Sequence, residues 1–499
     1  MSTSCLKTEP SPPSSTFPPK WTSPTTFRSA WAVRRKIRPK RTTLTNLRRT
    51  EKRASAQSGK ASFLMQHPGA QFKLIHAGTL VDGRGGPSVP SGAVLVQGSK
   101  IVAVGRQGEV AAPDGASVET LDYPDKTLMP GMVDAHTHHV GFGDGRVGDE
   151  VATYPDEILT VQAARNARKA LFSGVTTIRE NGPKNMTMFR LRDAVNDGLT
   201  IGPRMHLCGR PVSIIGGHMG YFGSEATGPN ETRAMTRQLI KEGADYIKIT
   251  ATGGSTATSF TMRPSFNVDE LLAITDEAHK FGKPTAAHCL STQGTANSLD
   301  AEVDMIIHCV FKRVDGTNYF DEEVAERIVR QGAYVNPTLH VFRARIWTLQ
   351  HRKEREGLTT QQQAELDEEL REFDVRIEDC RRLIEMGAKV ITGSDSSWGN
   401  YMLGNTAYEA ECLVMSGYSN EQGVYSVTGD AARSLDMDDK VGTLEAGKEA
   451  DLVILDGDPT ADIRNLWNVE DVFLAGNRVE RGSSESLAAI RQQPPENGI

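Results

Sequence analysis

Cysteine and long apolar runs are scarce in this chain of 499 residues. The six cysteines are too few and too irregularly spaced for a disulfide scaffold of this size, which indicates a reducing compartment. No uninterrupted apolar run approaches the ~18 residues of a membrane-spanning helix, which argues against an integral membrane protein. The hydrophobic content of 38% is typical of a globular protein and excludes a coiled coil, a collagen and a fully disordered chain.

Acidic residues are almost absent from the first 60 residues, which carry 14 Lys and Arg against two acids. The rest of the chain carries 43 basic against 61 acidic residues, and this mildly acidic body argues against a nucleic-acid groove. Residues 1–64 are rich in Ser, Pro, Lys and Arg, with too little apolar content to fold, so we predict a disordered basic leader. An organellar transit peptide and a basic binding arm are the alternatives to an inert leader.

Two short segments near the ends of the chain have the same residue pattern. Residues 70–128 and 439–482 both alternate short apolar stretches with Gly and Asp-Gly turns, which is the pattern of small β strands. Neither segment is long enough to form a stable domain by itself. We therefore predict that they pair into one composite β-sandwich, with residues 483–499 as a C-terminal tail.

The central segment, residues 129–438, alternates short apolar strands with helices. This α/β pattern, with polar residues at the carboxyl ends of the strands, predicts a TIM (β/α)8 barrel whose active site lies at that end. A doubly wound sheet is the competing topology. The eight candidate strands are MVDAHTH, GVTTIREN, RMHLCG, YIKIT, PTAAHC, DMIIHC, AYVNPTL and KVITGSD.

Two helical signals stand out within this segment. Asn267 and Glu270 have the spacing of a capping box, and Gly282 follows as a stop signal. Residues 339–387 are longer than a normal barrel connection and carry an apolar stripe spaced by four and three, which predicts an outer helix covering the sheet. A partner-binding coiled coil would need a longer repeat.

The sharpest chemical signal is the pair His136 and His138 at the end of the first predicted barrel strand. Side chains at i and i+2 of a strand point to the same face, so both imidazoles can chelate one metal ion. His288 and His308 end two further strands, twenty positions apart. Four imidazoles around one barrel mouth suit a borderline-soft ion such as zinc.

The cysteines that follow two of these histidines, Cys289 and Cys309, are predicted to face the other way and to pack as small hydrophobes. Asp395 ends the last strand, where a carboxylate can bind a metal and accept a proton from water, or else cap the following helix. Lys248 lies within an apolar strand, where burial lowers the pKa of its amine. A neutral amine there could add carbon dioxide to form a carbamate that bridges two cations, and a buried ion pair is the alternative.

Together these residues resemble the amidohydrolase superfamily, and within it the imidazolonepropionase-like group that includes prolidase-type peptidases and ochratoxinase. The resemblance covers residues 72–480 and rests on PGMVDAHTH, GVTTIRENG, GGHMG, YIKITATGG, AAHC, IIHC, GSD and GTLEAGKEADLVIL. It implies a metal-dependent hydrolase that cleaves an amide bond of a dipeptide or an N-acyl amino acid.

The resemblance also implies roles for individual residues. His136, His138 and Asp395 would hold one divalent ion, most simply Zn²⁺, and His288 and His308 a second, with carboxylated Lys248 as the bridge. Two such ions lower the pKa of a shared water and polarise the scissile carbonyl, while Asp395 acts as general base and then general acid. His218, in the Gly-rich loop after the third strand, would stabilise the oxyanion or hold the substrate.

Other functions on the same fold remain open at this point. A deaminase or a cyclic-amide (imidazolone) hydrolase would lack the bridging lysine, and a non-catalytic scaffold would have lost its ligands. Substrates of the resembling group often carry a carboxylate, which an arginine or a histidine would bind. The candidates on predicted barrel-mouth loops are His139, Arg210, His218, Tyr221 and His340.

For partners, we expect a small-molecule amide or dipeptide, with no nucleic acid and no membrane. The resemblance implies a homo-oligomer. The expected location is the cytoplasm, or an organelle if the leader is a transit peptide.

Overall fold

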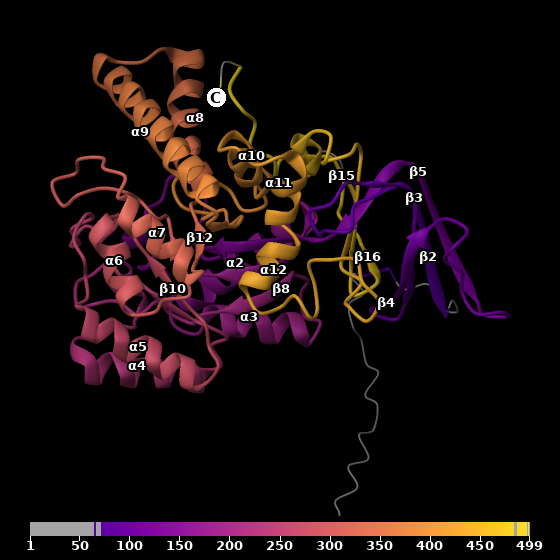
Figure 1. Ribbon diagram of the computed structural model, residues 1–499, viewed down its shortest axis with the longest axis horizontal. Coiled ribbons are helices and arrows are strands. Elements are labelled where there is room, and N and C mark those ends of the chain that lie inside the picture. The colour runs from indigo at the N-terminus through magenta and orange to yellow at the C-terminus, as the bar shows by residue number, and fades with distance from the viewer. Residues whose placement is uncertain (1–63, 66–70, 484–486, 497, 499) are drawn as a thin grey trace, which may run out of the picture. The chain divides into compact units, whose positions relative to one another are not determined.

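A computed structural model of the chain describes residues 64–65, 71–483, 487–496 and 498 (Figure 1). The predicted leader, residues 1–64, lies outside these ranges except for Leu64. Leu64 belongs to strand β1 (Leu64–Met65), which pairs with β16 (Asn477–Val479), so the sheet begins at the last residue of the predicted leader. None of the described helices is long and apolar enough to cross a membrane.

Strands from both ends of the described chain belong to one mixed sheet of eight strands, in the order β1-β16-β15-β14-β5-β2-β3-β4. Strand β5 from the first segment pairs antiparallel with β14 from the last, and Figure 1 shows the indigo and yellow strands side by side. Leu128 and Ile454 are opposed across this junction and fully buried. The remaining strands are β2 (Phe72–Leu80), β3 (Val89–Gln97), β4 (Lys100–Arg106), β5 (Val118–Pro130), β14 (Leu452–Leu455) and β15 (Val469–Leu474).

The central segment contains eight parallel strands, one at each predicted position. They form a sheet of three strands, in the order β6-β7-β8, and a sheet of five, in the order β13-β12-β11-β10-β9. The strands are β6 (Met132–Thr137), β7 (Val175–Glu180), β8 (Arg204–Leu207), β9 (Ile247–Ile249), β10 (Thr285–His288), β11 (Met305–Ile307), β12 (Tyr334–Asn336) and β13 (Lys389–Val390).

Backbone hydrogen bonds connect the two parallel sheets at both of their outer edges. Beyond β8, the N–H of Val212 donates to the carbonyl of Lys248 at 2.8 Å. Beyond β13, the N–H of Asp395 donates to the carbonyl of His136 at 2.7 Å, although only two residues of this strand are regular. The carboxyl ends of the first and last parallel strands therefore lie side by side.

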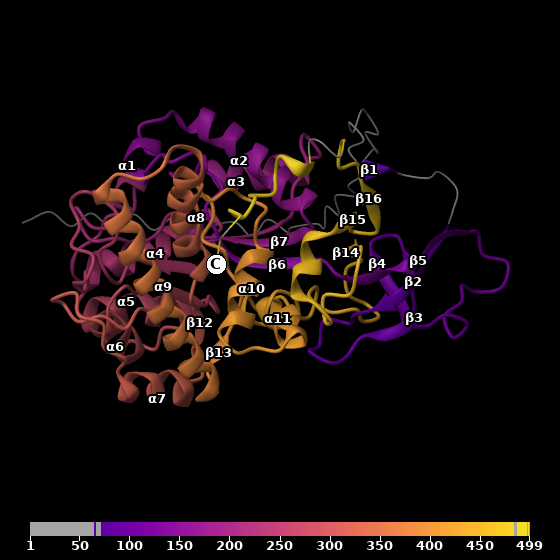
Figure 2. The same ribbon diagram turned by 90° about the horizontal axis from the view of Figure 1, so that it is seen from above.

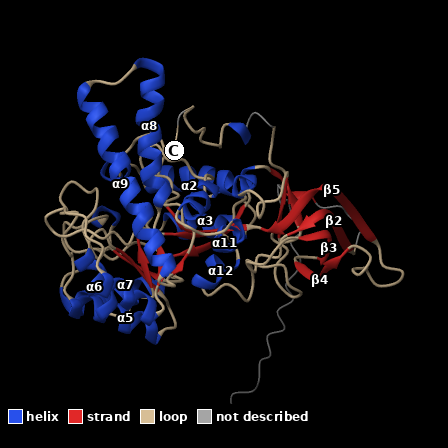
Figure 3. Ribbon diagram, turned by 45° about the horizontal axis from the view of Figure 1, so that its top comes forward, coloured by secondary structure: helices blue, strands red, loops and turns tan. Residues whose placement is uncertain are grey.

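Helices lie outside these strands, as Figures 2 and 3 show. The predicted capping box is confirmed at the start of α5, where Asn267 N–H donates to Glu270 Oε2 at 2.8 Å. Apolar side chains such as Ile178, Leu239 and Ile306 fill one core between strands and helices. The helices that precede β12 are α1 (Gly148–Val151), α2 (Asp156–Phe172), α3 (Thr187–Asn196), η1 (Gly220–Phe222), α4 (Gly228–Glu242), α5 (Val268–Lys280), α6 (Thr292–Asp300) and α7 (Glu322–Gln331).

The long connection after β12 forms two helices, α8 (Leu339–Glu356) and α9 (Thr360–Glu385), where the sequence indicated one. Gly357, with φ +77°, separates them, and the orange hairpin projects beyond its neighbours in Figure 1. The predicted apolar stripe lies on α9, with Leu366, Phe373 and Cys380 buried in the core. The helices that follow are α10 (Ala407–Met415), α11 (Asn420–Ser426), α12 (Gly429–Ser434) and η2 (Ile463–Trp467).

The described part of the C-terminal tail packs against α10 and the loop before it. Asn405 Nδ2 donates to the carbonyl of Ile490 at 3.0 Å, and the Tyr408 hydroxyl donates to the carbonyl of Gln492 at 2.6 Å. Ile490 is buried beside Phe172. The tail therefore covers apolar surface of the body.

A buried carboxylate on α10 fixes the start of α8. Glu409 accepts hydrogen bonds from the N–H groups of Leu339, at 2.8 Å, and His340, at 2.6 Å, which are free donors at a helix N-terminus. Burial raises the pKa of Glu409 to about 8, although the two N–H groups oppose the rise. Glu409 thus joins two helices whose positions decide where α8 enters the fold.

We expect Glu409→Gln to change how stability depends on pH. Between the ordinary carboxyl pKa and about 8, the folded protein binds more protons at Glu409 than the unfolded chain does. The contribution of Glu409 is therefore complete below that window and is lost as the pH rises through it. Thermal unfolding from pH 5 to pH 8 should show the Tm of the wild type falling relative to that of the variant. A constant difference in Tm would contradict this assignment.

Candidate metal centre

Three predicted ligands meet where the first and last parallel strands lie side by side. His136 Nε2 and His138 Nε2 lie 3.2 Å apart, and Asp395 Oδ1 lies 3.3 and 3.1 Å from them. All three side chains are buried, and their ligand atoms lie within 4.8 Å of one another. The strand alternation aims both imidazoles the same way, and the hydrogen bond from Asp395 N–H to the carbonyl of His136 holds Asp395 beside them.

The proton on His136 is placed by a neighbour at the end of β12. Asn336 Nδ2 donates to the carbonyl of Gly393 at 3.0 Å, so Asn336 Oδ1 is the atom 2.9 Å from His136 Nδ1. Because that oxygen can only accept, Nδ1 carries the proton and Nε2 keeps a bare lone pair. Partners of this kind orient histidines that bind metals.

The second pair of predicted histidines is arranged in the same way. His288 Nε2 donates to the carbonyl of Gly253 at 3.0 Å, which leaves Nδ1 with its lone pair. That nitrogen faces His308 Nε2 at 2.8 Å, and His308 Nδ1 lies 2.6 Å from Thr338 Oγ1. His308 Nδ1 also lies 4.0 Å from Asp395 Oδ2. Asp395 therefore stands between the two histidine pairs.

Lys248 lines the same cavity as these five residues. Its side chain is buried, and its amine donates a hydrogen bond to Asn181 Oδ1 at 3.4 Å. No carboxylate among the described residues lies within ion-pair distance of its amine. Burial lowers the pKa of Lys248 to about 8, with the charge of Asp395 opposing the shift. The buried ion pair suggested as an alternative is therefore not formed.

Burial also sets the charge of the ligand atoms. It lowers the pKa of His136, His138, His288 and His308, so all four imidazoles are neutral near pH 7. Burial alone would raise the pKa of Asp395, but the hydrogen bond from His138 and nearby positive charge hold it below its usual value. Neutral imidazoles packed around an ionised carboxylate are a donor set that fits divalent cations.

A cavity of about 280 Å³ opens from this cluster. Apolar and aromatic side chains form most of its wall, and the Trp398 ring lies 5.2 Å from that of His138. Besides the ligands and Lys248, the wall includes Val147, His218, Met219, Tyr221, Ser255, Leu290, Val341, Phe342, Arg345 and Trp398.

Two of the five candidate substrate residues, His218 and Tyr221, line this cavity. His218 Nδ1 lies 2.9 Å from Thr256 Oγ1, and burial lowers the pKa of His218 to about 3. A Cβ on Gly254 would lie 2.6 Å from the His218 ring, so only glycine allows this close approach.

The other three candidates are turned away from the cavity, which corrects the expectation that they face it. His139 follows His138 and points to the opposite side, with Nδ1 3.1 Å from Thr137 Oγ1. Arg210 is paired with Glu242 at 2.7 Å. His340 accepts a hydrogen bond from Arg343 Nε at 2.9 Å and is enclosed by aromatic rings.

Comparison with known proteins supports the same family as the motifs. The model of the amidohydrolase family matches residues 127–479. The chain belongs to the amidohydrolase family. It is 26% identical over 426 residues to the ochratoxinase of Aspergillus niger, covering 79% of this chain and 83% of that protein. It is 24% identical to the imidazolonepropionase of Symbiobacterium thermophilum, over 77% of this chain and 90% of that protein.

A solved structure agrees with the sequence relatives. A Xaa-Pro dipeptidase with bound methionine matches with a TM-score of 0.70 and 26% identity, covering 82% of this chain and all of that one. Amidohydrolases generally use divalent metals, and the His136, His138 and Asp395 cluster is the corresponding feature here.

Sequence reasoning missed several residues that shape this amidohydrolase site. Asn336 could have been found, because it is a polar residue at the end of a predicted strand, as the ligands are. Arg345, Phe342 and Trp398 carry no such signal, because a helix and an irregular loop bring them to the cavity. Cys289 and Cys309 are buried in the core and do not line the cavity, as predicted.

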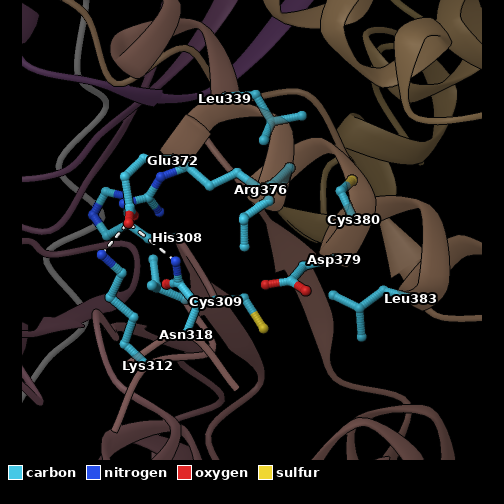
Figure 4. Close-up of a pocket in the computed structure, with 13 residues that line it drawn as sticks. His308, Cys309, Lys312, Asn318, Leu339, Glu372, Arg376, Asp379, Cys380 and Leu383 are labelled. Atoms are coloured by element: carbon cyan, nitrogen blue, oxygen red, sulfur yellow. Dashed lines mark hydrogen bonds and ion pairs between the residues drawn. The ribbon is translucent and has the colours of Figure 1, made fainter. Parts of the chain in front are cut away.

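A second, much smaller cavity of about 20 Å³ lies behind His308, between α9 and the residues after β11 (Figure 4). It has room for about one water molecule. Glu372 pairs with Lys312 at 2.5 Å and accepts a hydrogen bond from Asn318 Nδ2 at 3.0 Å. This network joins α9 to the segment that carries His308.

We expect Gly393→Ala to weaken metal binding although residue 393 is not a ligand. A Cβ there would lie 2.7 Å from the Asn336 amide and 2.8 Å from His136 Cβ, so the partner that orients His136 must move. Loss of such a partner lowers metal affinity by about 10- to 100-fold. Competition with a chromogenic chelator measures the affinity. Gly86→Ala, where a Cβ meets nothing, is the matched control, and equal zinc affinity in both variants would contradict the role of Asn336.

Proposed function

We propose that this protein is a metal-dependent amidohydrolase that cleaves the amide bond of a dipeptide or an N-acyl amino acid. The observation that carries the proposal is the convergence of four histidines, Lys248 and Asp395 on one cavity, in a chain that matches the amidohydrolase family over residues 127–479. Relatives named ochratoxinase and Xaa-Pro dipeptidase support an amide substrate.

The proposal includes a (β/α)8 barrel over residues 129–438. Its support is the set of hydrogen bonds that connects both outer edges of the two parallel sheets. Residues 70–128 and 439–482 would form the composite β domain, and their shared sheet supports this division. In a barrel, side chains at the carboxyl ends of the strands meet at one face, which is where the ligands lie.

For the metal centre, we assign His136, His138 and Asp395 to one divalent ion and His288 and His308 to a second. The bare Nε2 of His136 and the bare Nδ1 of His288 support this division into two sets. A carbamate on Lys248 would bridge them, because a buried amine with a pKa of about 8 is partly neutral and can add carbon dioxide. Zinc suits these ligands. Such ions, when bound, lower the pKa of water and polarise the scissile carbonyl.

Asp395 is the proposed general base and acid. It is ionised near neutral pH, and its carboxylate is the one found among the described residues that line the cavity, so it can accept the proton of the attacking water. The same carboxyl then delivers the proton to the departing amine, which leaves Asp395 ready for another cycle.

His218 is proposed to hold the substrate oxygen. Thr256 engages Nδ1, so Nε2 is the nitrogen available to the cavity, and the low pKa keeps the ring neutral. A neutral imidazole can donate one hydrogen bond to a developing oxyanion without adding a charge that would repel the metal ions. Tyr221, beside it in the wall, would contact the substrate.

Hydrolysis of a cyclic amide is the second candidate function. The imidazolonepropionase relative supports it, whereas the buried Lys248 favours the binuclear peptidase-like site. The buried Lys248 also disfavours a deaminase. A non-catalytic scaffold is disfavoured because the chain carries a residue that can bind metal at all six predicted ligand positions. A cytoplasmic location and a homo-oligomer stay predictions from the sequence.

We expect Asp395→Asn to abolish turnover, because it removes both a ligand and the proton acceptor. The test is mass-spectrometric detection of products from dipeptides, N-acyl amino acids, lactones and amino-heterocycles with zinc-loaded protein. On the amide that the wild type cleaves, kcat/KM should fall by at least about 10²- to 10⁴-fold. Asp379→Asn, a carboxylate on α9 that lines only the small cavity, is the matched control. Full activity in Asp395→Asn would refute the mechanism.

Lys248→Met is expected to lower the metal content from two ions to one. Methionine fills a similar volume but cannot form a carbamate, whereas His136, His138 and Asp395 are unchanged. Metal analysis after dialysis against zinc and bicarbonate gives the stoichiometry. Two tightly held ions in the variant would show that Lys248 is not a bridge.

A further inference from the structure

One cationic side chain in the cavity wall has no place in the proposed metal centre. Among the described residues that line the cavity, the lysines and arginines are Lys248 and Arg345. Arg345 lies on α8, four residues after Val341, so both project from one face of the helix. Val341, Phe342 and Arg345 place this face of α8 in the cavity wall. None of the three is a predicted metal ligand. The metal centre uses strand ends, whereas Arg345 comes from the hairpin.

Arg345 is held loosely enough to accept an anionic partner. Its nearest carboxylate, Glu369 on α9, lies 4.0 Å away, and 57% of the Arg345 side chain is exposed. An ion pair at this distance and exposure contributes little. A carboxylate entering the cavity could instead accept two parallel hydrogen bonds from the guanidinium, which is the stronger geometry.

A second guanidinium packs behind Arg345 on the same aromatic ring. The Arg345 guanidinium lies 5.3 Å from the Phe342 ring centre, and that of Arg376 lies 3.7 Å from the same ring. Arg376 Nε is buried and has no hydrogen-bond partner among the described residues. Two guanidinium groups therefore share one aromatic ring, and Glu369, Glu372 and Asp379 offset the charge of Arg376.

Apolar groups surround the rest of the space next to Arg345. Phe342, Val341 and Trp398 line the wall, and Val147 and Tyr221 also face the cavity. Burying an apolar side chain against such a wall is favourable, whereas the described residues that line the cavity offer a basic side chain no carboxylate other than Asp395.

We propose that Arg345 binds the free carboxylate of the substrate and so selects amides of amino acids with apolar or aromatic side chains. This inference rests on the proposed function, because it places the scissile amide between the metal centre and Arg345. Lys248 is assigned to the metal centre and His218 Nδ1 is engaged by Thr256 Oγ1 at 2.9 Å, so Arg345 is the cationic side chain of the described wall that can bind the carboxylate. Arg345 is thus a specificity-determining residue rather than a ligand.

The test compares N-benzoyl-L-phenylalanine with N-benzoyl-L-phenylalaninol, which lacks only the carboxylate. Zinc-loaded wild-type protein should release benzoate from the acid with the lower KM. Arg345→Met should raise the KM for the acid by about 10- to 100-fold, the range for loss of a charged hydrogen-bonding partner, with a small effect on kcat and on the alcohol. Arg345→Lys should restore part of the preference, because lysine keeps the charge without the planar fork.

Two further variants separate this role from a general effect on α8. Arg352→Met, seven residues along the same helix, removes an arginine that pairs with Glu356 and lines a neighbouring cavity of about 300 Å³ instead. Its KM values should equal those of the wild type. Glu369→Gln removes the acid that competes for Arg345 and should lower the KM for the acid substrate. An acid preference that survives in Arg345→Met would overturn the proposal.

Failure of the proposed function gives a different result. If wild-type protein leaves both compounds intact, the amidase assignment fails for this substrate class, and calorimetric titration of the two compounds still tests Arg345. Binding that favours the acid in the wild type and is lost in Arg345→Met supports the proposal. Equal binding of acid and alcohol, or no binding of either, overturns it.

Discussion

The packing of four neutral imidazoles around one ionised carboxylate is the interaction on which the rest of the site depends. Burial suppresses protonation of His136, His138, His288 and His308, while Asp395 stays charged among them. Hydrogen bonds from neighbouring segments then decide which nitrogen faces the cavity. Asn336 does this for His136, and the Gly253 carbonyl does it for His288. The proton positions at the strand ends are therefore set by residues that are not among those lining the cavity.

The α8–α9 hairpin has a different part in the molecule. Its stripe on α9 completes the core, and its first helix supplies Val341, Phe342 and Arg345 to the cavity wall. Glu409 fixes the first residues of α8, so the position of this wall depends on a buried contact with α10. The strand ends thus supply the predicted metal ligands, and the hairpin supplies another part of the cavity wall.

Much of the fold followed from local patterns. Each of the eight parallel strands was predicted from a short apolar run that ends in glycine or a polar residue, and the capping box at Asn267 marked the start of α5. The pair His136 and His138 was predicted from strand alternation, which is a local property. His288, His308 and Asp395 were chosen as polar residues at the ends of apolar runs, and Lys248 as a charge within one. The same alternation should have excluded His139, which follows His138 and points to the opposite face. Arg210 and His340 could not be excluded, because Glu242 and Tyr401 reach them only in the folded chain.

The sequence by itself determined which residues have the right chemistry and which strands carry them, because side-chain direction along a strand depends on neighbours in the chain. Only the tertiary structure decided how they meet. The proton position on His136 depends on Asn336, which is 200 residues away in sequence, and on the Gly393 carbonyl. The cavity wall likewise joins Tyr221, Arg345 and Trp398 from three separate segments. Such contacts come from the packing of distant segments, and no periodicity in the chain encodes them.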